Sequence, residues 1–338
     1  MRVYRLQEFG RIEGLALCEE AVPEPGPTEI VIRVRAASLN RRDWSILQKT
    51  YPLPGRSGVV PLSDGAGAVV AVGSAVKRFS LGDRVTGSYF PRWRDGRIAR
   101  DLIDQLGCTI DGMLAEYALL DQEWAVRVPG HLTWEEAATL TCAGVTAWNS
   151  VVETGHARAG ETVLINGTGG VSLFALQLAK MMGCRVIATT SSAAKADRLR
   201  GLGADHVINY SKEREWGKAV RDVTGGEGAD LILDTRGPDT LEQSLNAVAL
   251  YGRIILLIAR GAKGSLFQFS GDAYSRSLAT ILRIFVGSRA SLEAMAKAVA
   301  ARELRPIIDR VFPFAEARQA YEYFAEGDVF GKVVIAGA

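Results

Sequence analysis

The second half of the chain alternates short apolar runs with longer segments of helical periodicity. Apolar runs of strand length fall near 162–166, 185–190, 206–208, 229–234 and 252–258, and helical patterns fall near 171–182, 193–202, 213–223 and 239–249. A sixth strand is predicted near Ile284–Gly287. Alternation of this kind is typical of the α/β class, so the pattern predicts a doubly wound parallel sheet.

The two ends of the chain have a different pattern. Residues 1–124 contain short alternating runs separated by Gly and Pro, which favours an antiparallel, barrel-like β domain. The tail contains a helix, a strand, a second helix and a final strand, and it is predicted to return to the first domain. The domains are therefore predicted at 1–124, 125–288 and 289–338.

A glycine-rich loop follows the first strand of the alternating region. Gly167 allows a tight turn, Gly169 lets backbone approach a pyrophosphate, and Ser172 stands where the usual fingerprint has its third glycine. Glycine clusters alone are more often plain turns, but the next strand follows at βαβ spacing. The loop therefore predicts a dinucleotide site, with contacts from Gly167, Thr168, Gly169, Gly170, Val171 and Ser172.

The end of the second strand indicates which dinucleotide is bound. A carboxylate there would bind the adenosine ribose and repel a 2′-phosphate, but this chain has Thr190, Ser191, Ser192 and then Lys195. Hydroxyls and an ammonium suit a phosphate, so NADP(H) is favoured over NAD(H). Alternatively, the serines cap the next helix and Lys195 is a solvated surface residue; both interpretations can hold at once.

Composition excludes several classes of protein. Lys and Arg number 40 and Asp and Glu 38, so the net charge of +2 gives no basic surface for nucleic acid or membranes. No apolar run reaches membrane-spanning length. The four cysteines are scattered, which is typical of reduced thiols in a cytoplasmic protein. We expect an enzyme that acts on a small molecule.

Motifs along nearly the whole chain resemble the medium-chain dehydrogenase/reductase superfamily. They are Ala37–Trp44, Asp64–Gly67, Ser80–Val85, Cys142–Thr146, Val163–Ser172, Ala204–Tyr210 and Phe330–Lys332. The resemblance implies a GroES-like barrel as the first domain, a Rossmann domain as the second, and an active site in the cleft between them. It also implies a homodimer joined through edge strands, with which the apolar run 254–258 is compatible; a buried central strand explains that run equally well.

The resemblance extends to the zinc-independent branch of that family, close to quinone oxidoreductases and zinc-independent alcohol dehydrogenases. Zinc-dependent members use Cys, His and Cys, where this chain has Asn40, Ser63 and Cys142. The lobe that carries four cysteines for a structural zinc contains only Cys108 in residues 90–112. No metal site is therefore expected.

Without a metal, side chains, water or a cofactor hydroxyl must polarise and protonate the substrate. By resemblance, Asn40 faces the nicotinamide and substrate, although alone it would be a turn residue after the strand 30–36. Tyr51 matches a tyrosine that lines the substrate pocket of quinone oxidoreductases, and packing beside Pro52 and Pro54 explains it equally well.

Other cofactor contacts are also implied by the resemblance or by position at the carboxyl edge of the sheet. They are Thr146, Tyr210, Thr235, Ile258, Phe330, Gly331 and Lys332. As bare sequence features, Tyr210 would be a half-buried strand end and Lys332 a solvated surface residue.

The expected function is an NADPH-dependent oxidoreductase that passes a hydride to a quinone, an enone or a carbonyl carbon. One alternative is an enoyl-thioester reductase, for which Arg92–Arg97 and Arg100 would bind a phosphorylated carrier. Another is an NADPH-binding sensor or interaction protein without turnover, because a fold does not determine function.

Overall fold

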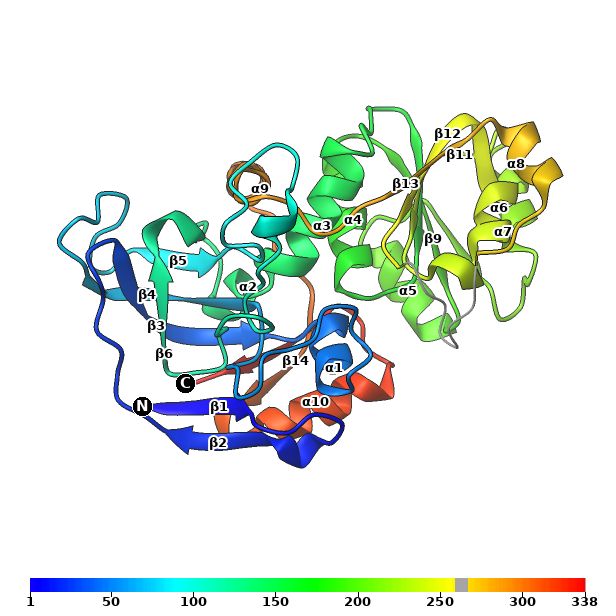
Figure 1. The fold of residues 1–338 in the computed structure, drawn as a ribbon. Helices are drawn as coiled ribbons and strands as arrows, with labels where there is room; N and C mark the ends of the chain where they lie inside the picture. Colours follow the sequence, from blue (N-terminus) through cyan, green and yellow to red (C-terminus); the bar gives the residue numbers. More distant parts are fainter. Residues whose placement is uncertain (259–266, 338) are drawn as a thin grey trace. The chain divides into compact units, whose positions relative to one another are not determined.

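The computed structural model describes residues 1–258 and 267–337, and the chain forms two compact units (Figure 1). Unit 1 contains Met1–Val145 and Gly287–Ala338, and unit 2 contains Thr146–Val286. By this division residues 125–145 belong to unit 1, whereas the sequence pattern predicts a boundary after residue 124.

Unit 2 is built on a six-stranded parallel sheet. Its strands are β8 (Thr162–Asn166), β9 (Arg185–Thr190), β10 (His206–Asn209), β11 (Ala229–Asp234), β12 (Val248–Leu256) and β13 (Thr280–Arg283). The strands lie in the order β10-β9-β8-β11-β12-β13. The chain builds the sheet outward from β8 to β10, and then outward on the other side from β11 to β13, so the order switches between β8 and β11. This is the doubly wound, Rossmann-like arrangement predicted from the alternating pattern.

Helices cover both faces of this sheet. They are α4 (Gly170–Met181), α5 (Ala193–Gly201), α6 (Trp216–Val223), α7 (Leu241–Ala247) and α8 (Gly271–Ser277), with α3 (Val145–Trp148) before β8. Figure 1 shows α4 and α5 on one face and α6 and α7 on the other. Residues 163–165 of β8 are therefore buried on both sides, which explains their continuous apolar sequence.

The sixth strand lies earlier than the sequence pattern predicts. The pattern places it at Ile284–Gly287, but β13 ends at Arg283, and Ile281 and Leu282 pair with Ile254 and Ile255. Val286 has a φ of +56°, which a strand does not accommodate. Ile284 and Val286 are buried although they lie outside the strand. Their apolar side chains therefore resemble a strand in the sequence.

The same pairings explain the apolar run 254–258. Strand β12 has β11 on one side and β13 on the other, so Ile254 and Ile255 are fully buried in the interior of the sheet. The run therefore gives no evidence about an interface, and the homodimer stays a prediction. Among the helices of the described ranges, none is both long and apolar enough to cross a bilayer.

Unit 1 is mainly antiparallel β structure. Its strands are β1 (Arg2–Leu6), β2 (Leu15–Glu19), β3 (Glu29–Ser38), β4 (Asp64–Val72), β5 (Arg84–Gly87), β6 (Tyr117–Asp121), β7 (Ala125–Arg127), β14 (Ile308–Pro313) and β15 (Lys332–Ala336). Its helices are α1 (Arg41–Leu47), α2 (Trp134–Ala137), α9 (Arg289–Ala301) and α10 (Ala317–Glu326).

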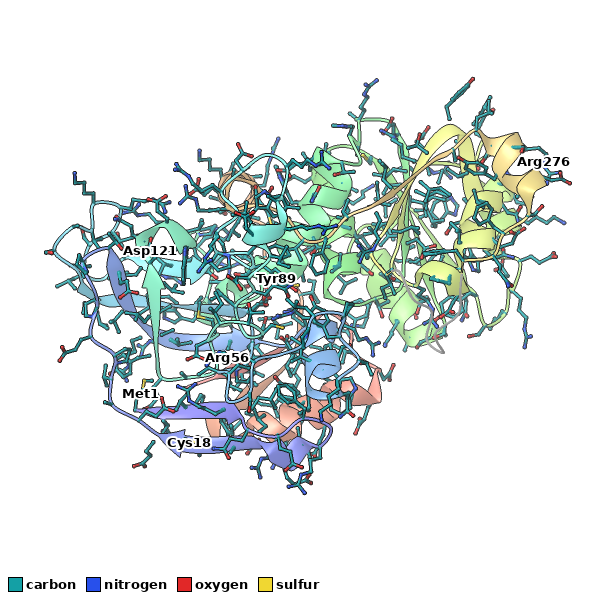
Figure 2. All side chains as sticks on the ribbon, in the orientation of Figure 1. Met1, Cys18, Arg56, Tyr89, Asp121 and Arg276 are labelled. Atoms are coloured by element: carbon teal, nitrogen blue, oxygen red, sulfur yellow. The ribbon has the colours of Figure 1, made fainter. Side chains whose placement is uncertain are left out.

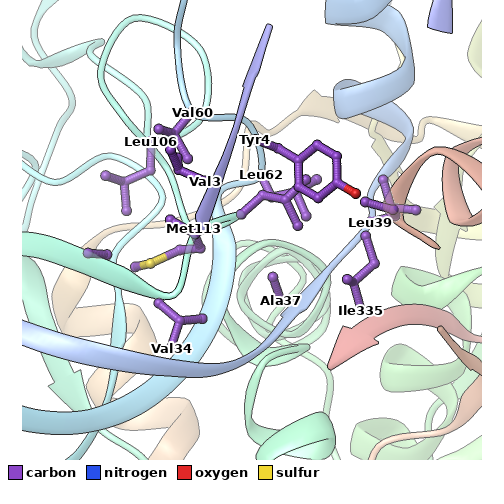
Figure 3. Close-up of a cluster of buried hydrophobic side chains, with 14 of the residues drawn as sticks. Val3, Tyr4, Val34, Ala37, Leu39, Val60, Leu62, Leu106, Met113 and Ile335 are labelled. Carbon is purple, nitrogen blue, oxygen red and sulfur yellow. The ribbon is translucent and has the colours of Figure 1, made fainter. Parts of the chain in front are cut away.

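The long strand β3 organises the unit 1 sheet. The order is β14-β15-β3-β4-β5-β7, and β6 also pairs with β3. The tail of the chain thus contributes β14 and β15, with β15 antiparallel to β3. Figure 3 shows part of the core that this pairing closes, with Ala37 of β3 near Ile335 of β15. The register also brings Lys332, at the start of β15, near the end of β3.

Candidate functional site

The glycine loop of unit 2 forms an open, uncapped helix start. Gly167 has a φ of +82° and its N–H donates to Thr189 O at 3.1 Å, so the chain turns sharply out of β8. Gly169 is the N-cap of α4, and no side chain of residues 1–258 or 267–337 caps this end. A Cβ at Gly169 would meet no atom of the described residues within 4 Å. Unpaired N–H groups, helix-dipole charge and open space together fit a pyrophosphate.

Two hydroxyls hold the strand end that precedes this loop. Ser172 Oγ and Thr235 Oγ1 both donate to Asn166 O, at 2.8 and 3.0 Å. Thr189 Oγ1 also donates to Asn166 Oδ1 at 3.2 Å. The serine at the third fingerprint position is therefore small enough for close packing and also bonds to the strand. Thr235 follows β11 at the carboxyl edge of the sheet, but its hydroxyl donates to the Asn166 carbonyl.

The end of β9 presents hydroxyls, as the sequence predicts. Thr190 Oγ1 accepts from Ser192 N at 3.2 Å, and Ser192 Oγ accepts from Lys195 N at 3.4 Å as the N-cap of α5. The capping interpretation of Ser192 is thus confirmed. Ser191 is exposed, and Tyr210 N donates to Thr190 O at 3.0 Å, which brings that aromatic residue beside the strand end.

The remaining unit 2 candidates lie in different environments. Ile258 follows β12 and is 37% exposed. It lies close to Gly237, which follows the end of β11, because a Cβ added at Gly237 would be 2.4 Å from Ile258 O. Thr146 is buried, and its carbonyl accepts from Ser150 Oγ at 2.6 Å. Both residues stay predictions as cofactor contacts.

Unit 1 contains a buried charged cluster around Lys332. The Lys332 side chain is 2% exposed, and Nζ donates to Leu39 O at 2.8 Å and to Asn40 Oδ1 at 2.6 Å. Nζ also lies 3.4 Å from Asp64 Oδ2, whose carboxylate is fully buried. Gly331 precedes Lys332 and has a φ of +105°. A Cβ added there would lie only 2.3 Å from Ile307 O, so the backbone conformation before Lys332 requires glycine. Lys332 is therefore a core residue rather than a solvated one.

The contact with Lys332 determines the orientation of the Asn40 amide. An ammonium only donates, so the atom facing it must be Oδ1, and Nδ2 then faces away from Lys332. Asn40 is 8% exposed, and its Nδ2 is a buried donor without a partner in the part of the chain that the structure describes. Asp43 Oδ2 accepts from Asn40 N at 2.8 Å, so the Asp43 side chain caps the start of α1.

Tyr51 belongs to a second buried polar group. Its hydroxyl lies 2.8 Å from Tyr89 OH and 2.9 Å from Gln105 Oε1, which also accepts from Tyr89 at 3.0 Å and from Arg42 Nη2 at 3.2 Å. The Arg42 guanidinium lies over both rings, 5.6 Å from the Tyr51 centroid and 4.8 Å from that of Tyr89. Burial raises the pKa of both phenols, although Arg42 acts to lower them, so both stay protonated near neutral pH. Tyr89 is labelled in Figure 2.

Comparisons with known proteins cover the whole chain. Residues 26–130 match the family described as alcohol dehydrogenase GroES-like domain, and residues 170–301 match zinc-binding dehydrogenase. A zinc-type alcohol dehydrogenase-like protein of Schizosaccharomyces pombe is 39% identical over 324 residues, covering 94% of this chain and 93% of that protein. The chain belongs to the medium-chain dehydrogenase/reductase superfamily.

Two further relatives agree with this membership and with the predicted fold class. A quinone oxidoreductase of Pseudomonas aeruginosa is 33% identical and covers 97% of both chains. The crystal structure of an NAD-dependent alcohol dehydrogenase superposes with a TM-score of 0.90, at 34% identity and with 100% of both chains covered. The chain is therefore an oxidoreductase of a dinucleotide-binding family.

Medium-chain dehydrogenases/reductases that use zinc would hold it at the positions of Asn40, Ser63 and Cys142. Here Asn40 Oδ1 faces an ammonium, and Ser63 Oγ donates to Asp64 Oδ1 at 2.7 Å. Burial, reinforced by Asp64, raises the pKa of the Cys142 thiol, which disfavours the thiolate that zinc requires. Over residues 1–258 and 267–337, no group of three or more His, Cys, Asp or Glu could hold a metal. These residues do not fit a zinc ion.

The structure adds site residues that the sequence analysis did not single out. Arg42, Tyr89 and Gln105 surround Tyr51, and no local pattern marks them because Gln105 lies 54 positions from Tyr51. Burial makes Phe330 a core residue. In the loop considered for a phosphorylated carrier, Arg92 pairs with Asp104 at 3.2 Å with its side chain 54% exposed, as in an ordinary solvated loop.

Proposed function

We propose that this protein is a zinc-independent, NADP(H)-dependent oxidoreductase that transfers a hydride between nicotinamide and a quinone, enone or carbonyl/alcohol substrate. The observation that carries the proposal is the pairing of Lys332 with Asn40, because an amide stands at one of the positions where zinc-dependent members have a metal ligand, and a buried ammonium faces it. Whole-length relatives named quinone oxidoreductase and alcohol dehydrogenase support the reaction class.

The residues of unit 2 suit a dinucleotide with a 2′-phosphate. Backbone N–H groups of Gly169–Ser172 would bind the pyrophosphate, and Tyr210 and Thr190 lie where the adenosine end is expected. The exposed Ser191 hydroxyl and the N-terminus of α5 would receive the 2′-phosphate, with Lys195 as the cation. No carboxylate occurs between Thr190 and Ala196 to repel it. Since one solved relative is named an NAD-dependent enzyme, this preference is a matter for direct assay.

The bound dinucleotide supplies the hydride chemistry, and the side chains of unit 1 supply orientation and polarity. Asn40 Nδ2 donates to a carbonyl oxygen and stabilises negative charge that develops on it. Tyr51 holds a proton at its hydroxyl oxygen, because burial raises its pKa above the ordinary phenol value.

Proton counting shows how Tyr51 can donate outward. Tyr51 and Tyr89 have one O–H each, whereas three short contacts join them to each other and to Gln105 Oε1. Gln105 Oε1 can be satisfied by Arg42 and Tyr89 alone. When the Tyr51 proton passes to a substrate oxygen or carbon, Arg42 alone still donates to Gln105 Oε1, and the Tyr89 O–H can turn to donate to the Tyr51 oxygen.

The decisive assay is oxidation of NADPH and NADH with a panel of quinones, enones, aldehydes and enoyl thioesters. The proposal requires turnover that prefers NADPH and persists after treatment with a zinc chelator. Nucleotide binding without oxidation by any acceptor would instead favour a sensor or interaction protein. Turnover that falls as stoichiometric zinc is removed would contradict the zinc-independent assignment.

A further inference from the structure

The ammonium of Lys332 is enclosed by three oxygen acceptors. Leu39 O and Asn40 Oδ1 lie at 2.8 and 2.6 Å, and Asp64 Oδ2 lies at 3.4 Å. A lysine ammonium has three protons, so each acceptor can take one and none is left for a ligand. Lys332 therefore acts on whatever this site binds only through its neighbours.

Asp64 balances this buried charge. Its carboxylate accepts from Ser63 Oγ at 2.7 Å and lies 3.4 Å from both Ser38 Oγ and Lys332 Nζ. The shorter ammonium contact goes to the neutral Asn40 amide rather than to this carboxylate. Asp64 therefore neutralises the positive charge of Lys332, whereas the closest hydrogen bond of the ammonium is to Asn40.

We propose that Lys332 is a positioning residue that replaces the electrostatic role of a metal ion: it fixes and polarises the Asn40 amide so that Nδ2 donates to a carbonyl oxygen of the bound ligand. This inference rests on the proposed function. A charge-assisted bond to Oδ1 withdraws electron density from the amide and strengthens donation by Nδ2, since hydrogen bonds in a chain polarise one another. The buried Nδ2 has no partner in the described ranges, so a donor is available for this purpose.

The carbonyl has two possible sources, the substrate and the carboxamide of the nicotinamide ring. They differ in what a Lys332 variant changes. If the carboxamide is bound, the Kd for NADPH rises together with the loss of turnover. If the substrate is bound, kcat/KM for the acceptor falls while the Kd for NADPH stays within about threefold.

The test must separate positioning from charge balance, because Lys332→Met alone leaves Asp64 buried and unpaired. The informative variant is Lys332→Met with Asp64→Asn, which removes both charges. We expect it to fold and to lose about 100-fold or more in kcat/KM, since removal of an oxyanion donor lowers kcat by about 100- to 1,000-fold. Lys297→Met is the matched control, since that lysine is exposed on α9; its kcat/KM should stay within about twofold of wild type.

A third variant tests whether the effect passes through Asn40. Asn40→Ala should lose as much activity as the double variant, and adding it to the double variant should cost no more than about threefold further. A folded double variant with wild-type kcat/KM and wild-type NADPH affinity would overturn the proposal. Fully additive losses in the triple variant would overturn it as well.

A readout independent of activity distinguishes this inference from the proposed function. With selectively 15N-labelled asparagine, assigned through Asn40→Ala, the Asn40 side-chain NH2 signals should shift markedly in the Lys332→Met/Asp64→Asn protein but not in Lys297→Met. If wild-type protein shows no turnover with any acceptor, the proposed function fails. In that case the Asn40 side-chain NH2 signals alone test whether Lys332 polarises the amide. Signals that do not shift in the Lys332→Met/Asp64→Asn protein refute the positioning role.

Discussion

The hydroxyl oxygens of Tyr51 and Tyr89 lie 2.8 Å apart, and both phenols also contact Gln105 Oε1. Because only Tyr51 is proposed to give up its proton, the two residues should respond differently to loss of the hydroxyl. Tyr51→Phe should lower kcat by about 100-fold or more, the range for a lost general acid. Tyr89→Phe should lower kcat by less than about tenfold, since Arg42 still satisfies Gln105 Oε1.

Steady-state kinetics with one quinone and one enone, alongside thermal unfolding of each variant, would check this. Tyr51→Phe at wild-type kcat would assign proton delivery to water or a cofactor hydroxyl. Equal losses in the two variants would mean that the pair acts as one unit.

Gly169 offers a test of the pyrophosphate site that spares the fold. Its φ of −75° suits any residue, and a Cβ there meets no atom within 4 Å in the part of the chain that the structure describes. Gly169→Val should therefore change the free energy of unfolding by less than about 1 kcal/mol, while the new side chain occupies the space proposed for the pyrophosphate. The Kd for NADPH, measured by fluorescence titration, should rise at least about tenfold.

Gly130→Val is the matched control for this experiment. A Cβ at Gly130 would likewise meet no described atom within 4 Å, but Gly130 lies in unit 1. The Kd of the Gly130→Val protein for NADPH should equal that of the wild type. A Gly169→Val protein that binds NADPH normally would refute the site at the start of α4.

Ser191 tests the cofactor preference. It is exposed immediately after β9, whereas the neighbouring Thr190 and Ser192 oxygens accept backbone N–H bonds. Ser191→Asp adds a carboxylate that repels a 2′-phosphate and accepts from ribose hydroxyls, so the NADPH-to-NADH ratio of kcat/KM should fall at least about tenfold. Ser191→Ala, which removes only the hydroxyl, should lower the ratio by less. A wild-type preference for NADH would contradict the assignment.

Unit 2 could be predicted well from the sequence because its sheet is buried on both faces, which leaves continuous apolar runs such as 163–165. The same reasoning fails at Ile284 and Val286, where apolar residues are buried without forming a strand. Burial alone does not distinguish a strand from a packed turn, and the positive φ of Val286 cannot be read from its residue type.

The unit 1 site is less predictable because long-range pairing creates it. Asn40 and Lys332 are 292 positions apart, and a lone lysine near the end of a chain is usually solvated. The pairing of β15 with β3 on one side and with β14 on the other places it in the interior. The family resemblance indicates that Lys332 matters, but only the folded contacts assign its protons to Leu39, Asn40 and Asp64.

Gly331 is the residue that allows this burial. Its φ is +105°, and a Cβ would lie 2.3 Å from Ile307 O, so Gly331→Ala requires the backbone to shift. We expect a loss of about 2–4 kcal/mol in the free energy of unfolding. Gly327→Ala, with a φ of +81° but no atom closer than 3.9 Å, should cost only about 1 kcal/mol. Urea titrations would compare them, and equal losses would show that the close approach to Ile307 is unimportant.

Asp43 gives a prediction about pH. Burial raises its pKa to about 6, although Arg42 at 3.1 Å acts to lower it. The unfolded value is about 3.9, so between pH 4 and 6 the folded protein binds a proton that the unfolded chain has released. This contribution to stability is fully present below about pH 4 and is lost as the pH rises through 6. Two pKa units correspond to at most about 3 kcal/mol.

Asp43→Asn removes this titration and retains an oxygen to accept from Asn40 N. The free energy of unfolding of the variant minus that of the wild type should therefore increase by about 1–3 kcal/mol between pH 4 and pH 7. Urea titrations at four pH values would measure it. Asp95→Asn, at an exposed carboxyl, controls for the loss of one negative charge and should show a much smaller trend. A difference that instead decreases with pH would mean that Arg42 and the Asn40 N–H outweigh burial and hold the carboxyl ionised in the folded state.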